Sequence, residues 1–247
     1  MHLLEPGPPC DDLLAPYAAV ARVPRPGAPC WVLANMVGGL DGSAAAGGRV
    51  GGLSDAVDAE LFRLMRTLAD VVLVGAETVR REGYGPVRLP EERQAWRTAQ
   101  GRPPTPPVAV VSRSLRLDWD RPLFTDHHPR ARTVVLTSAS SRRHVAAPAG
   151  PGADVLDAGE DRVDLRRALD VLAGRGARVV LCEGGPTLLG ELVAADLLDE
   201  LCLTVAPVMG GDPLPLALTG GLSPLARFRL GHVAAHEDTL FLRYVRP

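Results

Sequence analysis

Two amino acids are missing from this chain of 247 residues. It has no lysine and no isoleucine, so all 27 of its basic residues are arginines. No physical constraint on a fold removes both at once, and we attribute the absence to a coding bias. Mechanisms that use a lysine Schiff base or a lysine general base are therefore excluded. The 27 basic and 29 acidic residues give a net charge of −2, which argues against a polybasic nucleic-acid surface.

Motifs for metal sites and for hydrolytic nucleophiles are missing as well. The histidines form no HxH or HExxH pattern, and the chain has no GxSxG, so we expect neither a zinc enzyme nor a nucleophile elbow. The cysteines form no CxxC pair, and two of them lie in apolar runs. We therefore expect buried, reduced thiols and no metal site. The four cysteines are Cys10, Cys30, Cys182 and Cys202.

Segments that would direct the chain to a membrane are not found either. The sequence does not open on a basic stretch followed by an apolar one, and it has no run of about 18 apolar residues. We expect no signal peptide and no membrane span, and we expect a cytoplasmic protein.

Short apolar runs alternate with segments in which apolar residues recur every three or four positions. This pattern predicts strands at 31–37, 70–75, 108–111, 133–136, 155–156, 178–182, 201–208, 228–233 and 239–245. It predicts helices at 57–68, 76–81, 91–97, 139–146, 163–172 and 186–193, with a shorter one within 13–20. We expect Ser54 to be the N-cap of the first of the longer helices.

Near-continuous apolar strands separated by helices predict an α/β fold, with a mostly parallel central sheet and helices on both faces. No helix separates the last two strands, so we expect an antiparallel edge at the C-terminal end of the sheet. The prolines before residue 30 indicate an N-terminal arm, residues 1–29, that lies over one domain, residues 30–247.

Ligands of such sheets bind at the carboxyl ends of the strands. The residues expected there are mostly small, hydroxylated or glycine, and several stand at a helix start, as a phosphate-bearing ligand requires. In residues 182–188 (CEGGPTL), the amides of Gly184, Gly185, Thr187 and Leu188 are placed to face a pyrophosphate. The alternative is a tight turn with packing glycines. The chain has no GxGxxG or Walker motif.

Other strand ends offer further candidates. Gly75 to Thr78 forms a second strand-to-helix turn, which is either a plain connection or part of a site. Ser112 and Arg113 suit a 2′-phosphate, which distinguishes NADP from NAD, although a lone arginine is often only solvated. Asp41 is either a turn former or a carboxylate that faces a substrate. Glu183 follows an apolar strand, so we expect it to be paired or functional.

Four ordered segments together resemble the riboflavin-biosynthesis pyrimidine reductase family, the reductase half of the bifunctional deaminase–reductase. They are residues 34–42 (ANMVGGLDG), 70–80 (DVVLVGAETVR), 182–188 (CEGGPTL) and 199–211, which opens with DEL and ends with APVMGG. Their order and spacing match over about residues 30–245.

The resemblance implies a dihydrofolate-reductase-like fold and an NADPH-dependent reductase, usually a homodimer. It implies reduction of a ribosylamino to a ribitylamino group on 5-amino-6-(5-phosphoribosylamino)uracil, a small-molecule substrate. NADPH would be held by eight residues: Gly75, Thr78, Ser112, Arg113, Gly184, Gly185, Thr187 and Leu188. Asn35, Asp41 and Glu183 would face the nicotinamide and the substrate, and one of the two carboxylates would orient or protonate the imine that precedes reduction.

The chain departs from the family pattern at two places. Ser43 follows Gly42 where the family often has a basic residue, and residues 80–86 (RREGYGP) replace a frequent Arg-Ala-Asp-Asn-Pro run. These departures keep two alternatives open. One is a dihydrofolate-reductase-like enzyme that reduces a pterin, and the other is an NADP-binding protein that has lost catalysis.

Overall fold

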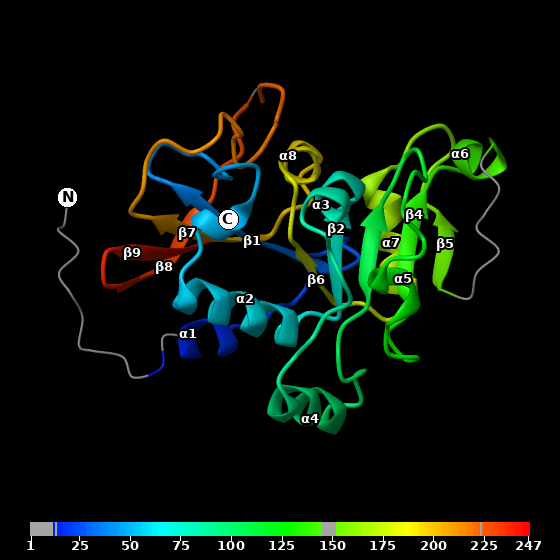
Figure 1. Ribbon diagram of the computed structural model, residues 1–247, viewed down its shortest axis with the longest axis horizontal. Helices are drawn as coiled ribbons and strands as arrows, with labels where there is room; N and C mark the ends of the chain where they lie inside the picture. The colour runs from blue at the N-terminus through cyan, green and yellow to red at the C-terminus, as the bar shows by residue number, and fades with distance from the viewer. Residues whose placement is uncertain (1–11, 13, 145–151, 223) are drawn as a thin grey trace.

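The computed structural model describes residues 12, 14–144, 152–222 and 224–247. Nine strands form one sheet in the order β5-β4-β3-β2-β6-β1-β7-β9-β8 (Figure 1). The strands are β1 Trp31–Gly39, β2 Val71–Gly75, β3 Val108–Val111, β4 Thr133–Thr137, β5 Ala153–Asp157, β6 Val179–Cys182, β7 Glu200–Ala206, β8 Arg229–His236 and β9 Thr239–Val245.

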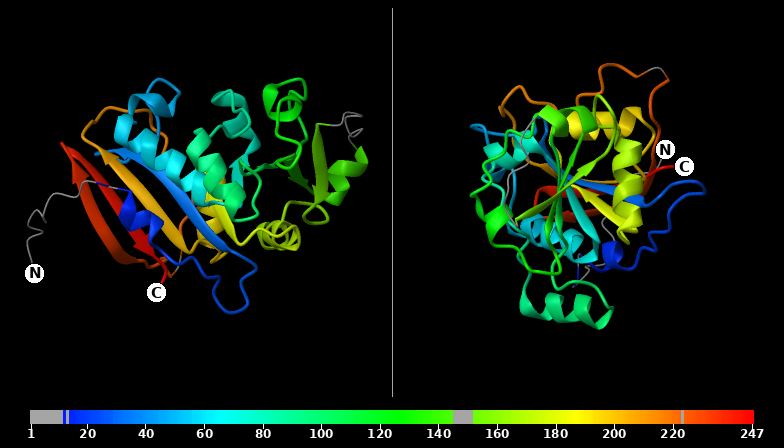
Figure 2. Two further views of the ribbon diagram at one scale, coloured as in Figure 1. Left: turned by 90° about the horizontal axis from the view of Figure 1, so that it is seen from below. Right: turned by 90° about the vertical axis from the view of Figure 1, so that its right-hand side faces the viewer.

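The sheet is parallel from β5 through β7, and its last two strands, β9 and β8, are antiparallel. This confirms the predicted parallel sheet with an antiparallel C-terminal edge. Figure 2 shows the twist of the sheet, with the β8–β9 hairpin at one end and β5 at the other. Because seven strands are parallel, their carboxyl ends meet at a common edge, where the site described below lies.

Helices cover both faces, as the sequence predicts. They are α1 Ala15–Ala18, α2 Ala56–Leu68, α3 Ala76–Arg81, α4 Glu91–Ala99, α5 Pro122–Thr125, α6 Ala139–His144, α7 Leu165–Gly174 and α8 Pro186–Ala194. Residues of α1, α2, α3 and α5 belong to the core on one face, and residues of α7 and α8 to the core on the other. The short α5 and a 3-10 turn at Val50–Gly52 were not predicted.

The central strands bury side chains on both faces, which explains their continuous apolar sequence. In β2, Val72 and Val74 pack on the side of α2, whereas Val71 and Leu73 pack on the side of α7 and α8. All four are at most 2% exposed. Burial of such a side chain stabilises the fold by about 1.5–3 kcal/mol relative to leaving it exposed.

The start of α2 differs from the prediction. Its N-cap is Asp55, whose side chain accepts a hydrogen bond from the Asp58 N–H at 2.7 Å. The predicted cap, Ser54, instead donates its hydroxyl hydrogen bond to the Asp58 carboxylate. Asp55 holds the cap because its carboxylate reaches the third helical N–H, the usual position for a capping bond.

The described part of the expected N-terminal arm contacts the sheet. Tyr17 of α1 is fully buried, and Arg22 donates to both carboxylate oxygens of Glu200 in β7 at 2.9 Å. Residues 1–11 and 13 of the arm lie outside the described residues, and so does Cys10. Cys30, Cys182 and Cys202 are buried free thiols, as predicted. In the described ranges, no helix is both long and apolar enough to cross a membrane.

Candidate active site

The ends of β2 and β6 bring two predicted motifs together. These strands pair in parallel, with Leu73 opposite Cys182. Beyond the pairing, the N–H of Glu183 donates to the Leu73 carbonyl at 3.0 Å, and the N–H of Gly75 donates to the Gly184 carbonyl at 2.9 Å. The turn that starts at Gly75 and the double-glycine turn therefore lie against each other at the carboxyl edge of the sheet.

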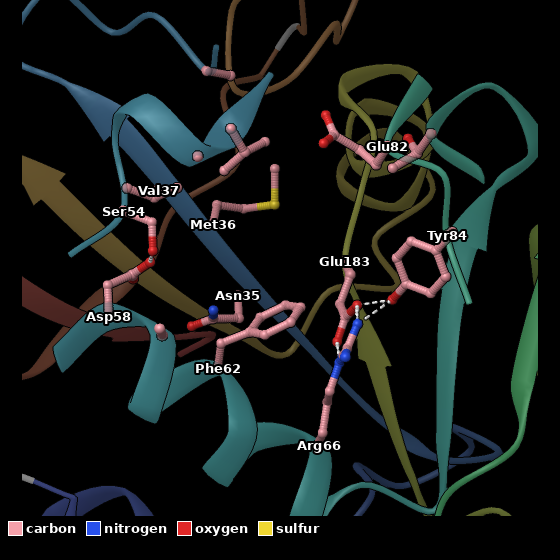
Figure 3. A pocket seen from close by; sticks show the side chains of 15 residues that line it. Asn35, Met36, Val37, Ser54, Asp58, Phe62, Arg66, Glu82, Tyr84 and Glu183 are labelled. Carbon is pink, nitrogen blue, oxygen red and sulfur yellow. Dashed lines mark hydrogen bonds and ion pairs between the residues drawn. The ribbon is translucent and has the colours of Figure 1, made fainter. Parts of the chain in front are cut away.

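A cavity of about 370 Å³ opens at this edge, between β1, α2 and the segment that follows α3 (Figure 3). Its walls are mostly apolar, with a few polar groups. The lining residues are Asn35, Met36, Val37, Ala44, Val50, Gly51, Ser54, Asp58, Ala59, Phe62, Arg66, Thr78, Glu82, Tyr84 and Glu183. An apolar pocket with a small set of polar groups is the usual form of a small-molecule site.

Glu183 is a carboxylate of this cavity that two neighbouring side chains hold in place. Arg66 of α2 forms a bidentate ion pair with Glu183, with Nε 2.7 Å from Oε1 and Nη2 2.8 Å from Oε2. The Tyr84 hydroxyl also donates to Oε2, as Figure 3 shows. The Glu183 side chain is 3% exposed. The prediction that this carboxylate is paired is therefore confirmed.

Two opposing effects act on the pKa of Glu183. Burial raises the pKa, and the Arg66 charge with its hydrogen bonds lowers it, leaving the pKa above the ordinary value. Arg66 is itself fixed, because its guanidinium lies over the Phe62 ring at 4.0 Å from the centroid. The group is thus a carboxylate held in one orientation by a guanidinium and a phenol.

A second cavity of about 310 Å³ adjoins the first and shares part of its wall. Residues that line both include Met36, Thr78, Glu82 and Glu183. Five of the eight predicted cofactor residues line the second cavity: Gly75, Thr78, Gly185, Thr187 and Leu188. The structure therefore brings these five together, with Glu183 at the junction of the two cavities.

The double-glycine turn leaves room only for backbone. A Cβ at Gly185 would lie 2.9 Å from Thr78 Oγ1, and Gly184 has a φ of +86° that other residues rarely adopt. Gly185 is the N-cap of α8, with no side-chain cap. The first N–H groups of a helix have no intrahelical partner, so the amides of Thr187 and Leu188 can serve a ligand.

Asn35 carries a second unused group. It is 7% exposed, lines the first cavity, and its Oδ1 has no hydrogen-bond partner among the described residues. A buried carbonyl oxygen without a partner costs free energy, so it points to a ligand that donates a hydrogen bond.

Asp41 lies away from the lining of both cavities. Its Oδ1 accepts hydrogen bonds from the Ser43 N–H and hydroxyl at 3.0 and 2.6 Å, and its Oδ2 accepts one from the Gly210 N–H at 2.7 Å. These bonds, with that of the Ser43 hydroxyl foremost, hold the pKa of Asp41 well below its ordinary value. These contacts fit the turn former, one of the two roles that the sequence leaves open for Asp41.

The remaining predicted cofactor residues also lie outside the lining of the two cavities. Ser112 is 1% exposed, and its hydroxyl oxygen accepts the Leu115 N–H at 3.1 Å, which fixes the turn after β3. Arg113 next to it is exposed. The carbonyl of Gly184 accepts the hydrogen bond from the Gly75 N–H.

Sequence reasoning missed several residues of the site. Arg66 and Phe62 lie four residues apart on α2, where the sequence indicates only an amphipathic helix. Tyr84 and Glu82 come from the segment that departs from the family pattern, and no pattern in the sequence placed them in the cavity. An arginine four residues after an aromatic residue was the one local signal, since such pairs meet on a helix surface.

Residues 30–241 match the model of the family described as the RibD C-terminal domain. The chain belongs to this family. The resemblance seen in the sequence is thereby confirmed.

Two archaeal relatives are both named 2,5-diamino-6-ribosylamino-4(3H)-pyrimidinone 5′-phosphate reductase. The Archaeoglobus fulgidus protein is 28% identical over 192 residues, which cover 77% of this chain and 86% of the relative. The Methanothermobacter thermautotrophicus protein is 29% identical over 181 residues, which cover 73% of this chain and 79% of the relative.

Solved structures agree with the fold. A pyrimidine reductase-like protein from Corynebacterium diphtheriae has a TM-score of 0.75 at 29% identity, with 87% of this chain and 91% of that chain covered. The riboflavin biosynthesis reductase Rib7 of Saccharomyces cerevisiae has a TM-score of 0.65 at 15% identity, with 93% and 94% covered, and supports the fold alone.

Proposed function

We propose that this chain is an NADPH-dependent reductase of a phosphoribosylamino-pyrimidine, acting in riboflavin biosynthesis. The observation that carries the proposal is the pair of adjoining cavities with Glu183 at their junction. One cavity has the size and walls for a pyrimidine, and the other collects the predicted cofactor residues. Family membership and the names of the relatives support the same substrate class.

Three observations fit NADPH. Gly75 and Gly185 line the second cavity, the first turn of α8 offers amides to a pyrophosphate, and Asn35 Oδ1 has no partner among the described residues. Gly75, Thr78, Gly184, Gly185, Thr187 and Leu188 would hold the cofactor around the pyrophosphate and nicotinamide, and Ser112 and Arg113 would hold the 2′-phosphate. When bound, NADPH supplies the hydride that reduces the substrate.

The chain itself contributes position and charge. Arg66 and Tyr84 hold Glu183 in one orientation. Its Oε1 accepts one hydrogen bond, from Arg66, and so keeps a lone pair that can accept an N–H of an aminopyrimidine. Asn35 Oδ1 is a second acceptor in the same cavity. The apolar walls exclude water, which strengthens both contacts. Glu183 suits the role of orienting or protonating the substrate imine better than Asp41, because Glu183 lines both cavities and Asp41 lines neither.

Absorbance at 340 nm tests the proposal directly. The purified chain is mixed with NADPH and, in separate reactions, with the 2,5-diamino-pyrimidinone or the 5-amino-uracil form of the ribosylamino 5′-phosphate. Oxidation of NADPH with either pyrimidine, and none with dihydrofolate, is the expected result. Turnover of dihydrofolate alone would favour the pterin reductase. NADPH binding without turnover of any of the three substrates would favour the NADP-binding protein that has lost catalysis.

The homodimer implied by the resemblance is part of the proposal, and light scattering of the purified chain tests it. The cytoplasmic location stays a prediction.

A further inference from the structure

A cavity of about 290 Å³ lies at the edge of the sheet formed by the amino ends of the parallel strands, opposite the edge that holds the candidate active site. Val71, the first residue of β2, lines it, whereas Gly75 at the other end of β2 lines the candidate cofactor cavity. About 13 Å of strand separates these two residues. In Figure 1, α4 and α3 lie beyond opposite ends of β2. The cavity is therefore distinct from the site described above.

Arginines dominate this cavity. Its lining contains the five arginines Arg97, Arg102, Arg130, Arg132 and Arg175. Among the described residues, two carboxylates pair with them. Asp70 lies 3.4 Å from Arg102, and Asp154 is shared by Arg132 at 3.2 Å and Arg175 at 2.7 Å. Five guanidinium groups against two carboxylates leave an excess of three positive charges around one cavity.

Arg97 is the least compensated of the five. It is fully buried, and no carboxylate in the described ranges forms an ion pair with it. Its Nε donates to the Pro103 carbonyl at 2.9 Å, and its Nη1 donates to the carbonyls of Thr67 and Ala69 at 2.7 and 2.6 Å. Its Nη2 has no partner among the residues described. Carbonyl contacts therefore account for two of its three nitrogens.

A buried charge is normally paired, because removal from water without a counter-charge is costly. Burial, with a smaller effect from the Arg102 charge, outweighs the opposing effect of the Asp70 charge and lowers the pKa of Arg97 to about 10. The guanidinium is thus still charged near neutral pH. An anion in the cavity would supply the missing counter-charge and a partner for Nη2.

We propose that this arginine cavity binds a small oxyanion of the phosphate class, either a free phosphate or pyrophosphate or the phosphates of a nucleotide. Guanidinium groups bind phosphate oxygens through two parallel N–H bonds, which makes arginine the preferred side chain for this ligand. Of the arginines that line the cavity, Arg130 and Arg175 are exposed, whereas Arg97 is buried. The lining therefore combines arginines that solvent, and hence a phosphate, can reach with a buried guanidinium that lacks a counter-charge.

Calorimetric titration of the full chain with sodium pyrophosphate, at constant ionic strength, tests the proposal. Replacement of Arg97 could prevent folding, so the test uses the double variant Arg130→Gln/Arg175→Gln. The matched control is Arg116→Gln/Arg121→Gln, which removes the same charge from exposed arginines outside the cavity. We expect the first variant to weaken pyrophosphate binding at least about tenfold, since it loses charge-assisted bonds, and the control to leave it unchanged.

The cofactor cavity is the competing site for pyrophosphate, and Gly185→Ala reports on it. Binding that is lost in Gly185→Ala and kept in Arg130→Gln/Arg175→Gln would overturn the proposal, and so would equal affinity in both double variants or no binding at all. A parallel titration with ADP separates the two sources. Tighter binding of ADP than of pyrophosphate, with the same dependence on the arginines, assigns the site to a nucleotide, and the reverse order assigns it to the free anion.

Discussion

Arg66 and Glu183 form a bidentate ion pair that joins the last turn of α2 to the residue after β6, 117 positions apart in the chain. The pair lies in the wall of the candidate substrate cavity, and the Tyr84 hydroxyl completes it. Its geometry fixes a buried carboxylate where the two cavities meet. Loss of either partner is therefore expected to change both the free energy of unfolding and the rate of the proposed reaction.

Replacing Arg66 by glutamine is expected to destabilise the fold in a pH-dependent way. Burial already raises the pKa of Glu183, and loss of Arg66 raises it further, while its value in the unfolded chain stays near 4.5. A carboxyl group with a raised folded-state pKa favours folding most when it is protonated. The loss should therefore be small at pH 4 and reach about 3 kcal/mol at pH 7, as for a buried pair that loses one partner.

Urea unfolding of Arg66→Gln at the two pH values measures this difference. Arg143→Gln is the control, because its partner Glu160 is exposed and such surface pairs contribute at most about 1 kcal/mol. Equal destabilisation by Arg66→Gln at pH 4 and pH 7 would contradict the account of Glu183.

Tyr84→Phe tests whether the phenol positions Glu183. The variant loses one hydrogen bond to a charged group, which corresponds to about a tenfold fall in kcat, with little change in KM. The acid limb of the kcat/KM profile should also move to higher pH, because the carboxylate loses a donor that stabilises its charged form. Tyr244→Phe, in β9 away from the cavities, should change neither. A lower rate with an unshifted pH profile would argue for packing alone.

Gly185→Ala tests the close approach at the double-glycine turn. The added Cβ would lie 2.9 Å from Thr78 Oγ1, so either the turn or Thr78 must move. Overpacking of this kind costs about 1–3 kcal/mol, and we expect NADPH affinity to fall about tenfold in a fluorescence titration. Gly174→Ala is the control, since a Cβ there meets nothing within 4 Å. Unchanged NADPH affinity in Gly185→Ala would remove this turn from the cofactor site.

The sequence predicted the strands and the order of the motifs because both depend on local patterns. Apolar runs such as residues 71–74 are buried on two faces, and the glycines that follow them stand at turns. Contacts between distant segments have no such pattern. Nothing near Arg66 in the sequence indicates that it meets Glu183, because β6 is inserted between β2 and β1 by topology.

Residue type alone also left the roles of two candidates open. Ser112 was chosen as a hydroxyl at a strand end, but its oxygen accepts the Leu115 N–H. Asp41 was chosen as a carboxylate near a glycine turn, and its oxygens are taken by Ser43 and Gly210. Gly210 is 169 positions away, so the turn-forming role depends on a long-range contact.

Asp41→Asn should therefore act on stability more than on catalysis. The hydrogen bonds that lower the pKa of Asp41 stabilise the fold when the group is charged, and this contribution is lost as pH falls below the ordinary value of 3.8. The variant should unfold at a lower temperature than the parent at pH 7, and the difference should shrink at pH 3. Asp120→Asn, an exposed control, should show neither effect. A loss of kcat as large as that of Glu183→Gln would show that Asp41 takes part in catalysis.

Arg113→Ala tests the proposed choice of NADPH over NADH. Arg113 is exposed at the carboxyl end of β3, beside the strand that ends at Gly75, so it is placed to reach a cofactor that extends from the α8 turn. A guanidinium bond to a 2′-phosphate contributes about 1.5–3 kcal/mol. This predicts that the Kd for NADPH rises about tenfold to hundredfold. The Kd for NADH, which lacks that phosphate, should not change, and Arg121→Ala should change neither. An equal loss for both cofactors would show that Arg113 does not read the 2′-phosphate.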